Sequence, residues 1–147
     1  MIWFKKYNVE EIDAYMTSKN GLAGLLDIHL IEIGDDFLKV RMPVTERLHQ
    51  VHGIMHGGAT CVLVETIGSI ASGLCIDLNE KHAVGSQIHV NHLRSLKTGV
   101  LIAICKPIHL GRQKHVWDIL VHEETNKKII AKGELTCAII TAREYDL

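Results

Sequence analysis

Apolar residues recur in the first third of the chain with two different spacings. Residues 9–18 have the helical spacing, and Asn8 is the expected N-cap in front of them. Residues 25–34 and 37–44 alternate with a period of two on either side of an Asp35–Asp36 turn. These patterns predict a short amphipathic helix followed by an antiparallel hairpin.

The longest apolar segment runs from Gly57 to about Leu78 and contains no proline, which predicts a helix buried on most of its circumference. After Asn79 the alternation returns in four further segments, at residues 83–94, 100–110, 115–124 and 127–140. A hydrophobic helix of this length needs apolar surface around most of its girth, which a strongly curved sheet supplies. We therefore predict an α+β fold in which five to six antiparallel strands wrap one long central helix.

The composition fits one domain without a polyanionic partner. No linker, repeat or low-complexity tract divides the 147 residues, so we expect a single domain at 1–147, in which residues 1–20 form a covering helical segment. The formal net charge of −1 provides no global field that would attract nucleic acid or an anionic membrane. We expect no nucleic-acid partner and no membrane partner.

Two further features predict a cytoplasmic protein. The N-terminal residues lack the pattern of a secretory signal, and no apolar segment reaches the roughly 20 residues that a transmembrane helix needs. The cysteines form no C-x-x-C pair and are typical of buried, reduced thiols. They are Cys61, Cys75, Cys105 and Cys137.

Two glycines open the predicted long helix. Gly57 and Gly58 follow His56, where the leading N–H groups have no intrahelical acceptor and the positive end of the helix dipole faces outward. Because Gly57 has no Cβ atom, a carbonyl oxygen can approach its N–H to about 3 Å, as in an oxyanion hole. The alternative is that the two glycines only permit a tight bend before the helix.

Glu65 is a lone carboxylate in the middle of the apolar segment. Such a group must be paired, exposed or used in chemistry. Ser69 lies one turn further along the helix and Ser72 lies seven residues from Glu65, so both are candidate polar neighbours that keep the carboxylate ionised. The alternative is a buried, capped carboxylate without a chemical role.

The spacing of Gly57 and Glu65 has a geometric consequence. They are eight residues apart, so a helix separates them by about 12 Å and one chain cannot bring both to one carbonyl. If the helices of two chains pack antiparallel, Glu65 of each chain lies beside Gly57 of the other. A two-fold axis then relates two equivalent sites.

Ten histidines raise the question of a metal site. His49, His52 and His56 have spacings of three and four residues, but Gly53 interrupts the set. His89 and His92 fall in a predicted strand, where a spacing of three directs side chains to opposite faces. We therefore predict ordinary hydrogen-bonded histidines and no metal.

Basic residues gather where predicted strands end. Residues 109–114, HLGRQK, place a flexible glycine between basic side chains, and Arg94 lies at the end of another predicted strand. Charge-assisted hydrogen bonds from these groups would suit the phosphates of a nucleotide. The alternative is a solvated turn without a ligand.

Several motifs occur in a characteristic order, namely Gln50, Gly53, His56-Gly57-Gly58, Glu65-Thr66-Ile67-Gly68-Ser69, Asn91-His92-Leu93-Arg94 and residues 107–113. Together they resemble the hotdog-fold thioesterases of the phenylacetate-pathway type, and the resemblance covers residues 25–140. Within that family, the chain is similar to the branch that contains the dihydroxynaphthoyl-CoA thioesterase and the enterobactin proofreading thioesterase. The resemblance implies the hotdog fold.

The resemblance also implies an activity, the hydrolysis of an acyl thioester of coenzyme A or of an acyl carrier protein, with an aromatic acyl group favoured and no cofactor. The position of Glu65 holds the carboxylate that acts as nucleophile or as general base toward water, with Ser69 as its polar neighbour. Gly57 of the partner chain polarises the carbonyl. Gln50 and His56 orient water, the carbonyl or the leaving group.

The same resemblance implies which residues contact the substrate and how the chains assemble. We expect a homo-oligomer, a dimer with shared sites that forms a dimer of dimers. The expected contacts with coenzyme A or the rest of the substrate are Gly85, His92, Leu93, Arg94, Ser95, His109, Leu110, Gly111, Arg112, Gln113 and Lys114. From its spacing to Glu65, we also expect Ser72 to contact the substrate.

Two other functions remain open from the residues. A module that binds acyl-CoA without turning it over would not require the whole set Gln50, His56, Gly57, Glu65 and Ser69. A hotdog dehydratase would pair a catalytic histidine with Asp or Glu across the dimer and would act on a β-hydroxyacyl chain.

Overall fold

The computed structural model describes residues 1–18 and 21–142. In this part of the chain three α-helices, one 3₁₀ turn and six strands occur in the order α1 (Val9–Met16), α2 (Leu22–Leu25), β1 (His29–Ile33), β2 (Leu38–Val44), η1 (Glu46–Leu48), α3 (Gly57–Leu74), β3 (Lys81–His92), β4 (Gly99–Leu110), β5 (Lys114–Glu123) and β6 (Ile129–Thr141). Residues 19–20 and 143–147, which fall in the expected covering segment and at the end of the expected domain, lie outside the described residues.

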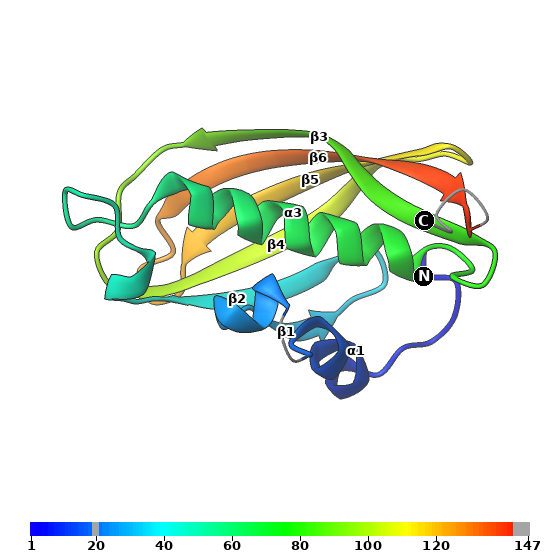
Figure 1. The fold of residues 1–147 in the computed structure, drawn as a ribbon, viewed down its shortest axis with the longest axis horizontal. Helices are drawn as coiled ribbons and strands as arrows, with labels where there is room; N and C mark the ends of the chain where they lie inside the picture. The colour runs from blue at the N-terminus through cyan, green and yellow to red at the C-terminus, as the bar shows by residue number, and fades with distance from the viewer. Residues whose placement is uncertain (19–20, 143–147) are drawn as a thin grey trace.

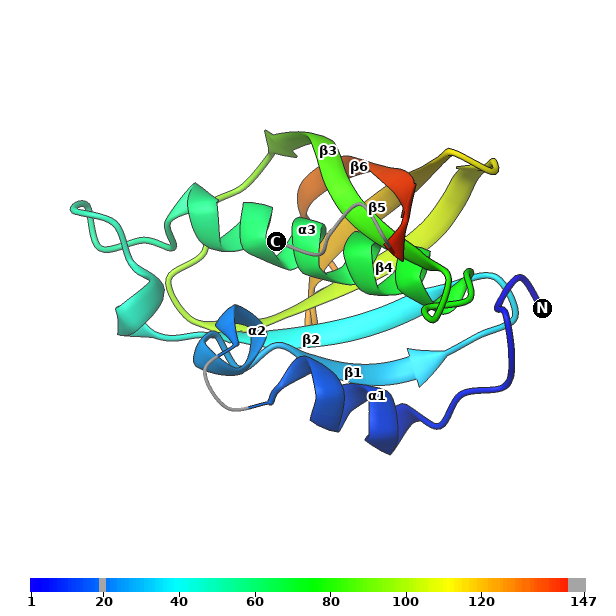
Figure 2. The same ribbon diagram turned by 45° about the vertical axis from the view of Figure 1, so that its right-hand side comes forward.

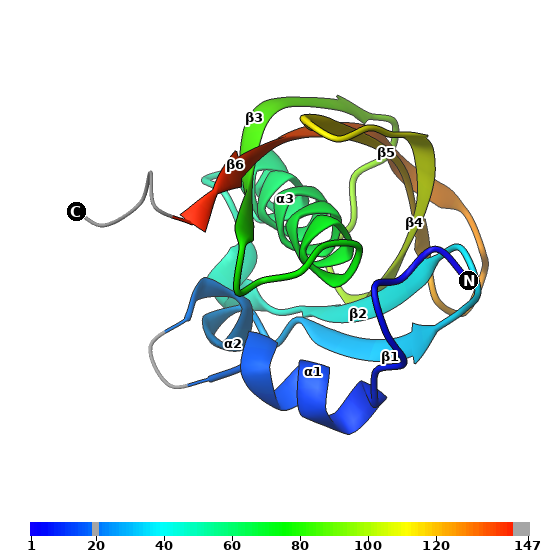
Figure 3. The same ribbon diagram turned by 90° about the vertical axis from the view of Figure 1, so that its right-hand side faces the viewer.

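The six strands form one antiparallel sheet that curves around α3. Their order is β1-β2-β4-β5-β6-β3, so β1 and β3 are the edges. Figure 1 shows α3 lying lengthwise in the sheet, and Figure 3 looks nearly along α3 and shows the strands curling around it. The predicted α+β fold, a long helix wrapped by a curved antiparallel sheet, is confirmed, and it is the hotdog arrangement.

The central helix buries one face and leaves another half-covered. Its buried residues are Ala59, Thr60, Leu63, Val64, Ile67, Gly68, Ala71, Ser72 and Leu74. A half-buried stripe at helical spacing runs along the opposite face and consists of Gly58, Cys61, Val62, Glu65, Thr66, Ser69, Ile70 and Gly73. Among the helices described, α3 alone is long and apolar enough to cross a membrane, but half of its residues are already buried inside this fold.

The central helix is shorter than the sequence predicted. We expected it to reach about Leu78, but it ends at Leu74 with Cys75 as its C-cap. Asp77 organises the turn that follows, because its carbonyl accepts the N–H of Lys81 at 2.9 Å and its carboxylate accepts the N–H of Asn79 at 3.0 Å. This local hydrogen bonding competes with the helix and stops it.

The first strand is also shorter than predicted. Instead of a strand over 25–34, the short helix α2 comes first and β1 begins at His29. The two are separated by Asp27, whose φ of 53° lies in the left-handed region. The predicted α1 also ends two residues early, at Met16, whereas its Asn8 cap is confirmed because the Asn8 side chain accepts the N–H of Glu11 at 3.2 Å.

The N-terminal helix is attached to the β1 edge of the sheet. One carboxylate oxygen of Asp13 accepts the backbone N–H of Leu30 at 2.7 Å, and the other lies 3.0 Å from Nδ1 of His29. Figure 2 shows α1 beside β1, on the side away from β2. A side chain of α1 thus satisfies a backbone donor that an edge strand would otherwise expose.

Two tryptophans close the core near the C-terminal end of α3. Trp117 is fully buried, and its indole N–H donates to Oγ of Ser72 at 2.6 Å. The Trp3 ring is stacked on Trp117 with 6.4 Å between centroids, and its own N–H donates to the carbonyl of Gly34 at 2.6 Å. The expected substrate contact of Ser72 is therefore wrong, because this serine is a fully buried hydrogen-bond acceptor in the core.

Ser72→Ala is expected to lower the free energy of unfolding by about 1–3 kcal/mol, because it leaves the Trp117 N–H buried without an acceptor. Urea denaturation at fixed protein concentration measures the change. The control Ser86→Ala removes an exposed hydroxyl and should change the free energy by less than about 0.5 kcal/mol. If Ser72→Ala costs as much in a Trp117→Phe background, the hydrogen bond is not the cause.

Candidate active site

The N-terminus of α3 presents a backbone N–H that no described residue accepts. His56 is the N-cap, and its Nδ1 accepts the N–H of Gly58 at 2.8 Å. The carbonyl of His56 accepts the N–H of Ala59 at 3.0 Å. The N–H of Gly57 has no acceptor among the described residues, so it is the free donor at the positive end of the helix dipole.

The last residue of β3 covers this helix terminus. A Cβ atom on Gly57 would lie only 2.9 Å from Nε2 of His92, so the imidazole could not keep this position beside a larger residue. Gly57 and the segment His92, Leu93, Arg94 and Ser95 line one cavity of about 310 Å³, together with Ile130. The structure therefore brings these sequence-predicted residues together.

Glu65 is half-buried on α3 and has two close neighbours. Ser69, the predicted partner, donates from Oγ to Oε1 of the carboxylate at 3.2 Å. Gly85 of β3 also packs against the carboxylate, since a Cβ atom on Gly85 would be 2.0 Å from the same oxygen, Oε1. Gly85, which we expected to contact the substrate, is thus packed on the carboxylate itself.

The helix α3 and the strand β3 run antiparallel to each other. His92 lies at Gly57 near one end of the helix, and Gly85 lies at Glu65 in its middle. The two groups on α3 are about 12 Å apart along the axis, so they do not converge within one chain.

Gln50 lies in the loop that leads into α3. Its backbone N–H donates to Ile54 at 2.9 Å, and its side-chain oxygen accepts the N–H of His52. Gly53 makes this tight loop possible with a φ of 72°. Gln50 and His56 therefore belong to the same end of the molecule as Gly57, away from Glu65 of the same chain.

The basic segment predicted at strand ends forms the β4–β5 hairpin. Gly111 donates its N–H to the carbonyl of Lys114 at 2.8 Å, and Arg112 and Gln113 are exposed. His109 and residues 111–114 surround an open, polar depression of about 560 Å³. Leu110 is the last residue of β4 beside it. Arg94 lies elsewhere, with its guanidinium donating to the carbonyl of Ile129 at 2.7 Å.

A buried histidine that the sequence did not single out lies beneath this hairpin. His115 is 4% exposed, and no described residue is a partner of its Nδ1. Burial lowers the pKa of His115, and the neighbouring His109 lowers it further. The imidazole of His115 is therefore neutral at pH 7 and adds no positive charge to the hairpin, which carries Arg112 and Lys114.

Comparison with known proteins identifies the class. The profile of the thioesterase superfamily matches residues 52–130. A 1,4-dihydroxy-2-naphthoyl-CoA hydrolase of Escherichia coli (strain K12) is 41% identical over 140 residues, which cover 95% of this chain and 100% of that protein.

Solved structures of related proteins have the same fold. A mutant of thioesterase PA1618 from Pseudomonas aeruginosa superposes with a TM-score of 0.91 at 38% identity, over 96% of this chain and 99% of that one. The E. coli PaaI protein from the phenylacetic acid degradation operon gives a TM-score of 0.76 at 26% identity, over 88% and 92% of the two chains.

The chain therefore belongs to the thioesterase superfamily and is a thioester hydrolase of the hotdog fold. The resemblance inferred from the motifs is confirmed, including its closeness to the dihydroxynaphthoyl-CoA hydrolase.

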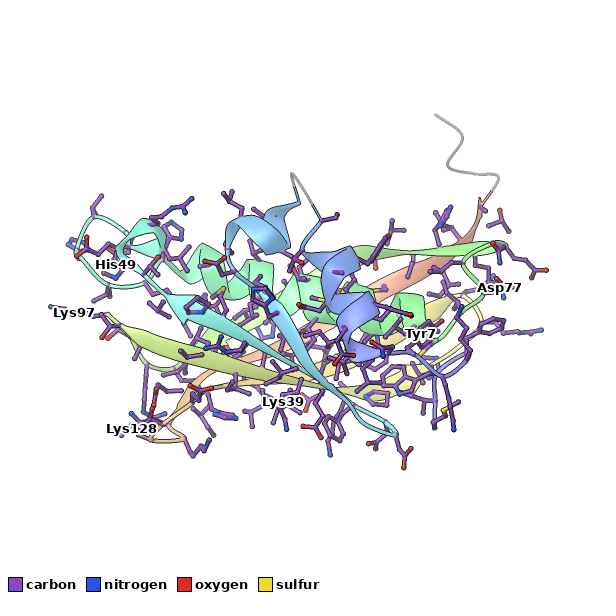
Figure 4. All side chains as sticks on the ribbon, turned by 90° about the horizontal axis from the view of Figure 1, so that it is seen from below. Tyr7, Lys39, His49, Asp77, Lys97 and Lys128 are labelled. Atoms are coloured by element: carbon purple, nitrogen blue, oxygen red, sulfur yellow. The ribbon has the colours of Figure 1, made fainter. Side chains whose placement is uncertain are left out.

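Metal chelation is expected to leave the thioesterase activity unchanged. Nε2 of His49 lies 2.7 Å from the carbonyl of Lys97 at one end of the molecule (Figure 4), and Nδ1 of His56 is used by Gly58. Within the described residues, no three His, Cys, Asp or Glu side chains cluster in a way that suits a metal ion. Activity before and after EDTA dialysis tests this. Loss of activity that zinc restores would contradict it.

Proposed function

We propose that this thioesterase hydrolyses aromatic acyl thioesters of coenzyme A at two equivalent sites, each built from two chains. The observation that carries the proposal is the arrangement on α3, where a free N–H donor and a carboxylate lie about 12 Å apart and each is packed against β3. The E. coli relative hydrolyses an aromatic acyl-CoA, which supports the substrate class.

The edge strand β3 supplies a route to the shared site. Within the described residues, β3 pairs only with β6, and residues 85–89 are exposed. If two β3 edges pair antiparallel with Gly85 of one chain opposite His92 of the other, Glu65 of one chain lies beside Gly57 of the partner subunit. Such self-complementary pairing satisfies both edges and creates two sites by symmetry.

In each proposed site the two chains have different tasks. The N–H of Gly57 of the partner subunit binds the thioester oxygen and stabilises the negative charge that develops there. Glu65 of the first chain attacks the carbonyl carbon, or takes the proton from a water that attacks it. The C–S bond then breaks and the thiolate of coenzyme A leaves. In the nucleophilic route the acyl group is left on Glu65 as a mixed anhydride, which water then hydrolyses to release the acid and restore the carboxylate. Gln50 and His56, on the Gly57 side, orient the water and the carbonyl.

The hairpin at residues 109–114 is the proposed contact for the phosphates of coenzyme A. In the sheet, Lys114 pairs with Ala138, and Ala138 pairs with Val84, next to Gly85. Across the sheet, the hairpin is therefore level with Glu65 of its own chain. In the proposed dimer, His92–Ser95 of the partner subunit reach this site together with Gly57 of the partner subunit. Arg112 and Lys114 supply charge for the phosphates, and the cavity at His92–Ser95 suits the pantetheine arm.

The assembly and the location are part of the proposal. We expect a dimer through β3 and a dimer of such dimers, and a thioester of an acyl carrier protein is the second candidate substrate. All four cysteines are free thiols, which fits the reducing conditions of the cytoplasm.

Glu65→Gln is expected to lower kcat by about 10²–10⁴-fold, because the shape is kept while the base or nucleophile is lost. KM should stay within a few fold of the wild-type value. Release of free thiol from benzoyl-CoA provides the measurement. Wild-type turnover in this variant would remove Glu65 from the mechanism.

Gly85→Ala tests whether the position of the carboxylate matters. The added methyl group occupies the place of Oε1, so the carboxylate must move and kcat should fall at least about tenfold. Ser86→Ala changes the next residue of β3 without touching Glu65 and serves as the matched control. Equal kcat values for both variants would show that the carboxylate position is not critical.

Two inactive variants are expected to restore each other if the site is shared. Glu65→Gln chains are mixed with His56→Ala chains under conditions that allow subunit exchange. In a mixed dimer both lesions fall in one site, and the other site is intact. Random pairing then gives about one quarter of the wild-type activity per chain, because half of the dimers are mixed and each has one good site.

Mass spectrometry under native conditions reports the exchange independently of activity. If mixed dimers form and activity does not return, the site lies within a single chain and the shared-site proposal is wrong.

A further inference from the structure

A second cavity, of about 460 Å³, lies between the N-terminal segment, α3 and β3. We call it the α1 cavity. Its wall includes Tyr7, Ile12, Tyr15, Ser69, Gly73 and Ala83. Figure 4 shows Tyr7 beside α1, at the end of the molecule opposite His49.

The α1 cavity adjoins the carboxylate of Glu65. Ser69, which lines the cavity, donates its hydroxyl to Glu65. Ala83 also lines it and lies two residues from Gly85, which packs on Glu65, so Ala83 and Gly85 share one face of β3. A group that leaves the carboxylate along α3 toward its C-terminal end therefore enters this cavity.

The lining of the cavity does not suit the phosphates of the coenzyme. Most of it is aliphatic or aromatic, with His82 as the one histidine among the described residues that line it, and none of these residues is Lys, Arg, Asp or Glu. The phosphates of coenzyme A need cationic partners, and those lie on the hairpin at residues 109–114. Two tyrosine rings in the wall suit the faces and edges of an aromatic ring system.

We propose that the α1 cavity receives the acyl group, and that Tyr7, Ile12 and Tyr15 of the N-terminal segment set the size and shape of the ring system that fits. This inference rests on the proposed function, since it requires the thioester carbonyl at Glu65. The three residues precede residue 52, where the match to the superfamily profile begins. Part of the acyl-group selection is thus assigned to residues outside the catalytic helix.

The wall formed by α1 is held in place and carries a polar group. Asp13 fixes the helix to β1 through the N–H of Leu30. Burial raises the pKa of Tyr7, with smaller contributions from Cys75 and Asp77, so its hydroxyl stays protonated at neutral pH. A protonated phenol at the rim is a donor for a hydroxyl or carbonyl substituent on the ring.

Gly73 provides a way to fill the cavity without disturbing the fold. A Cβ atom there would meet only Cδ2 of Leu78, at 3.9 Å, which is ordinary contact. A larger side chain at this position therefore projects into the cavity and is not forced against the backbone. Replacement of a glycine inside a helix also removes an unfavourable helix propensity.

The test compares Gly73→Leu with the wild type on two thioesters, 1-naphthoyl-CoA and propionyl-CoA. We expect kcat/KM for the naphthoyl thioester to fall at least about tenfold, while that for the propionyl thioester stays within threefold. Ile12→Ala, which removes contacts from the opposite wall, should raise KM for the naphthoyl thioester several fold. Glu10→Ala, on the exposed side of α1, is the matched control and should change neither thioester.

Binding of the product supplies a readout without turnover. 1-Naphthoate should bind the wild type, measured by isothermal titration calorimetry, and bind Gly73→Leu at least about tenfold more weakly. Equal affinity for naphthoate, or equal changes in kcat/KM for the two thioesters, would overturn the assignment of the cavity. Failure of the proposed function would give a different result, because the wild type would then hydrolyse neither thioester.

Discussion

The structure depends on the antiparallel packing of β3 along the central helix. This contact is close at two points, where His92 meets Gly57 and where Gly85 meets Glu65. At each point a glycine faces a side chain of the other element, so strand and helix lie close together in this register. The register fixes the carboxylate beside the β3 edge and the free N–H at the end of the same edge. The proposed shared site depends on this placement.

The periodicity of the sequence predicted the elements well because each one buries a regular face. The alternating segments after Asn79 became strands, and the apolar segment became the central helix. The errors arose where local hydrogen bonds compete with periodicity. Asp77 ends α3 with its own carboxylate and carbonyl, and residues 22–25 form a helical turn where we expected a strand to begin at Leu25. Hydrophobic spacing contains no information about such competition.

Some contacts in the site follow from local sequence, and others depend on segments that are far apart in the chain. Helical spacing was sufficient to predict Ser69 beside Glu65, and the free N–H of Gly57 follows from its place at the start of a helix. Ser72 has a similar spacing from Glu65, yet Trp117, 45 residues away, binds it in the core. The packing of Gly85 on the carboxylate and the wall that α1 contributes also have no local signal. They depend on which segments meet in the folded chain.

The contact of Gly85 with Glu65 has a consequence for how this enzyme can change over evolutionary time. Gly85 has no side chain and supplies no proton, charge or nucleophile, but a single methyl group there would take the place of a carboxylate oxygen. Selection on the reaction therefore constrains Gly85, although its only contribution is to leave room for the carboxylate. The residues of the N-terminal segment touch no reacting group, so they are free to drift and to admit new acyl groups while the chemistry stays the same.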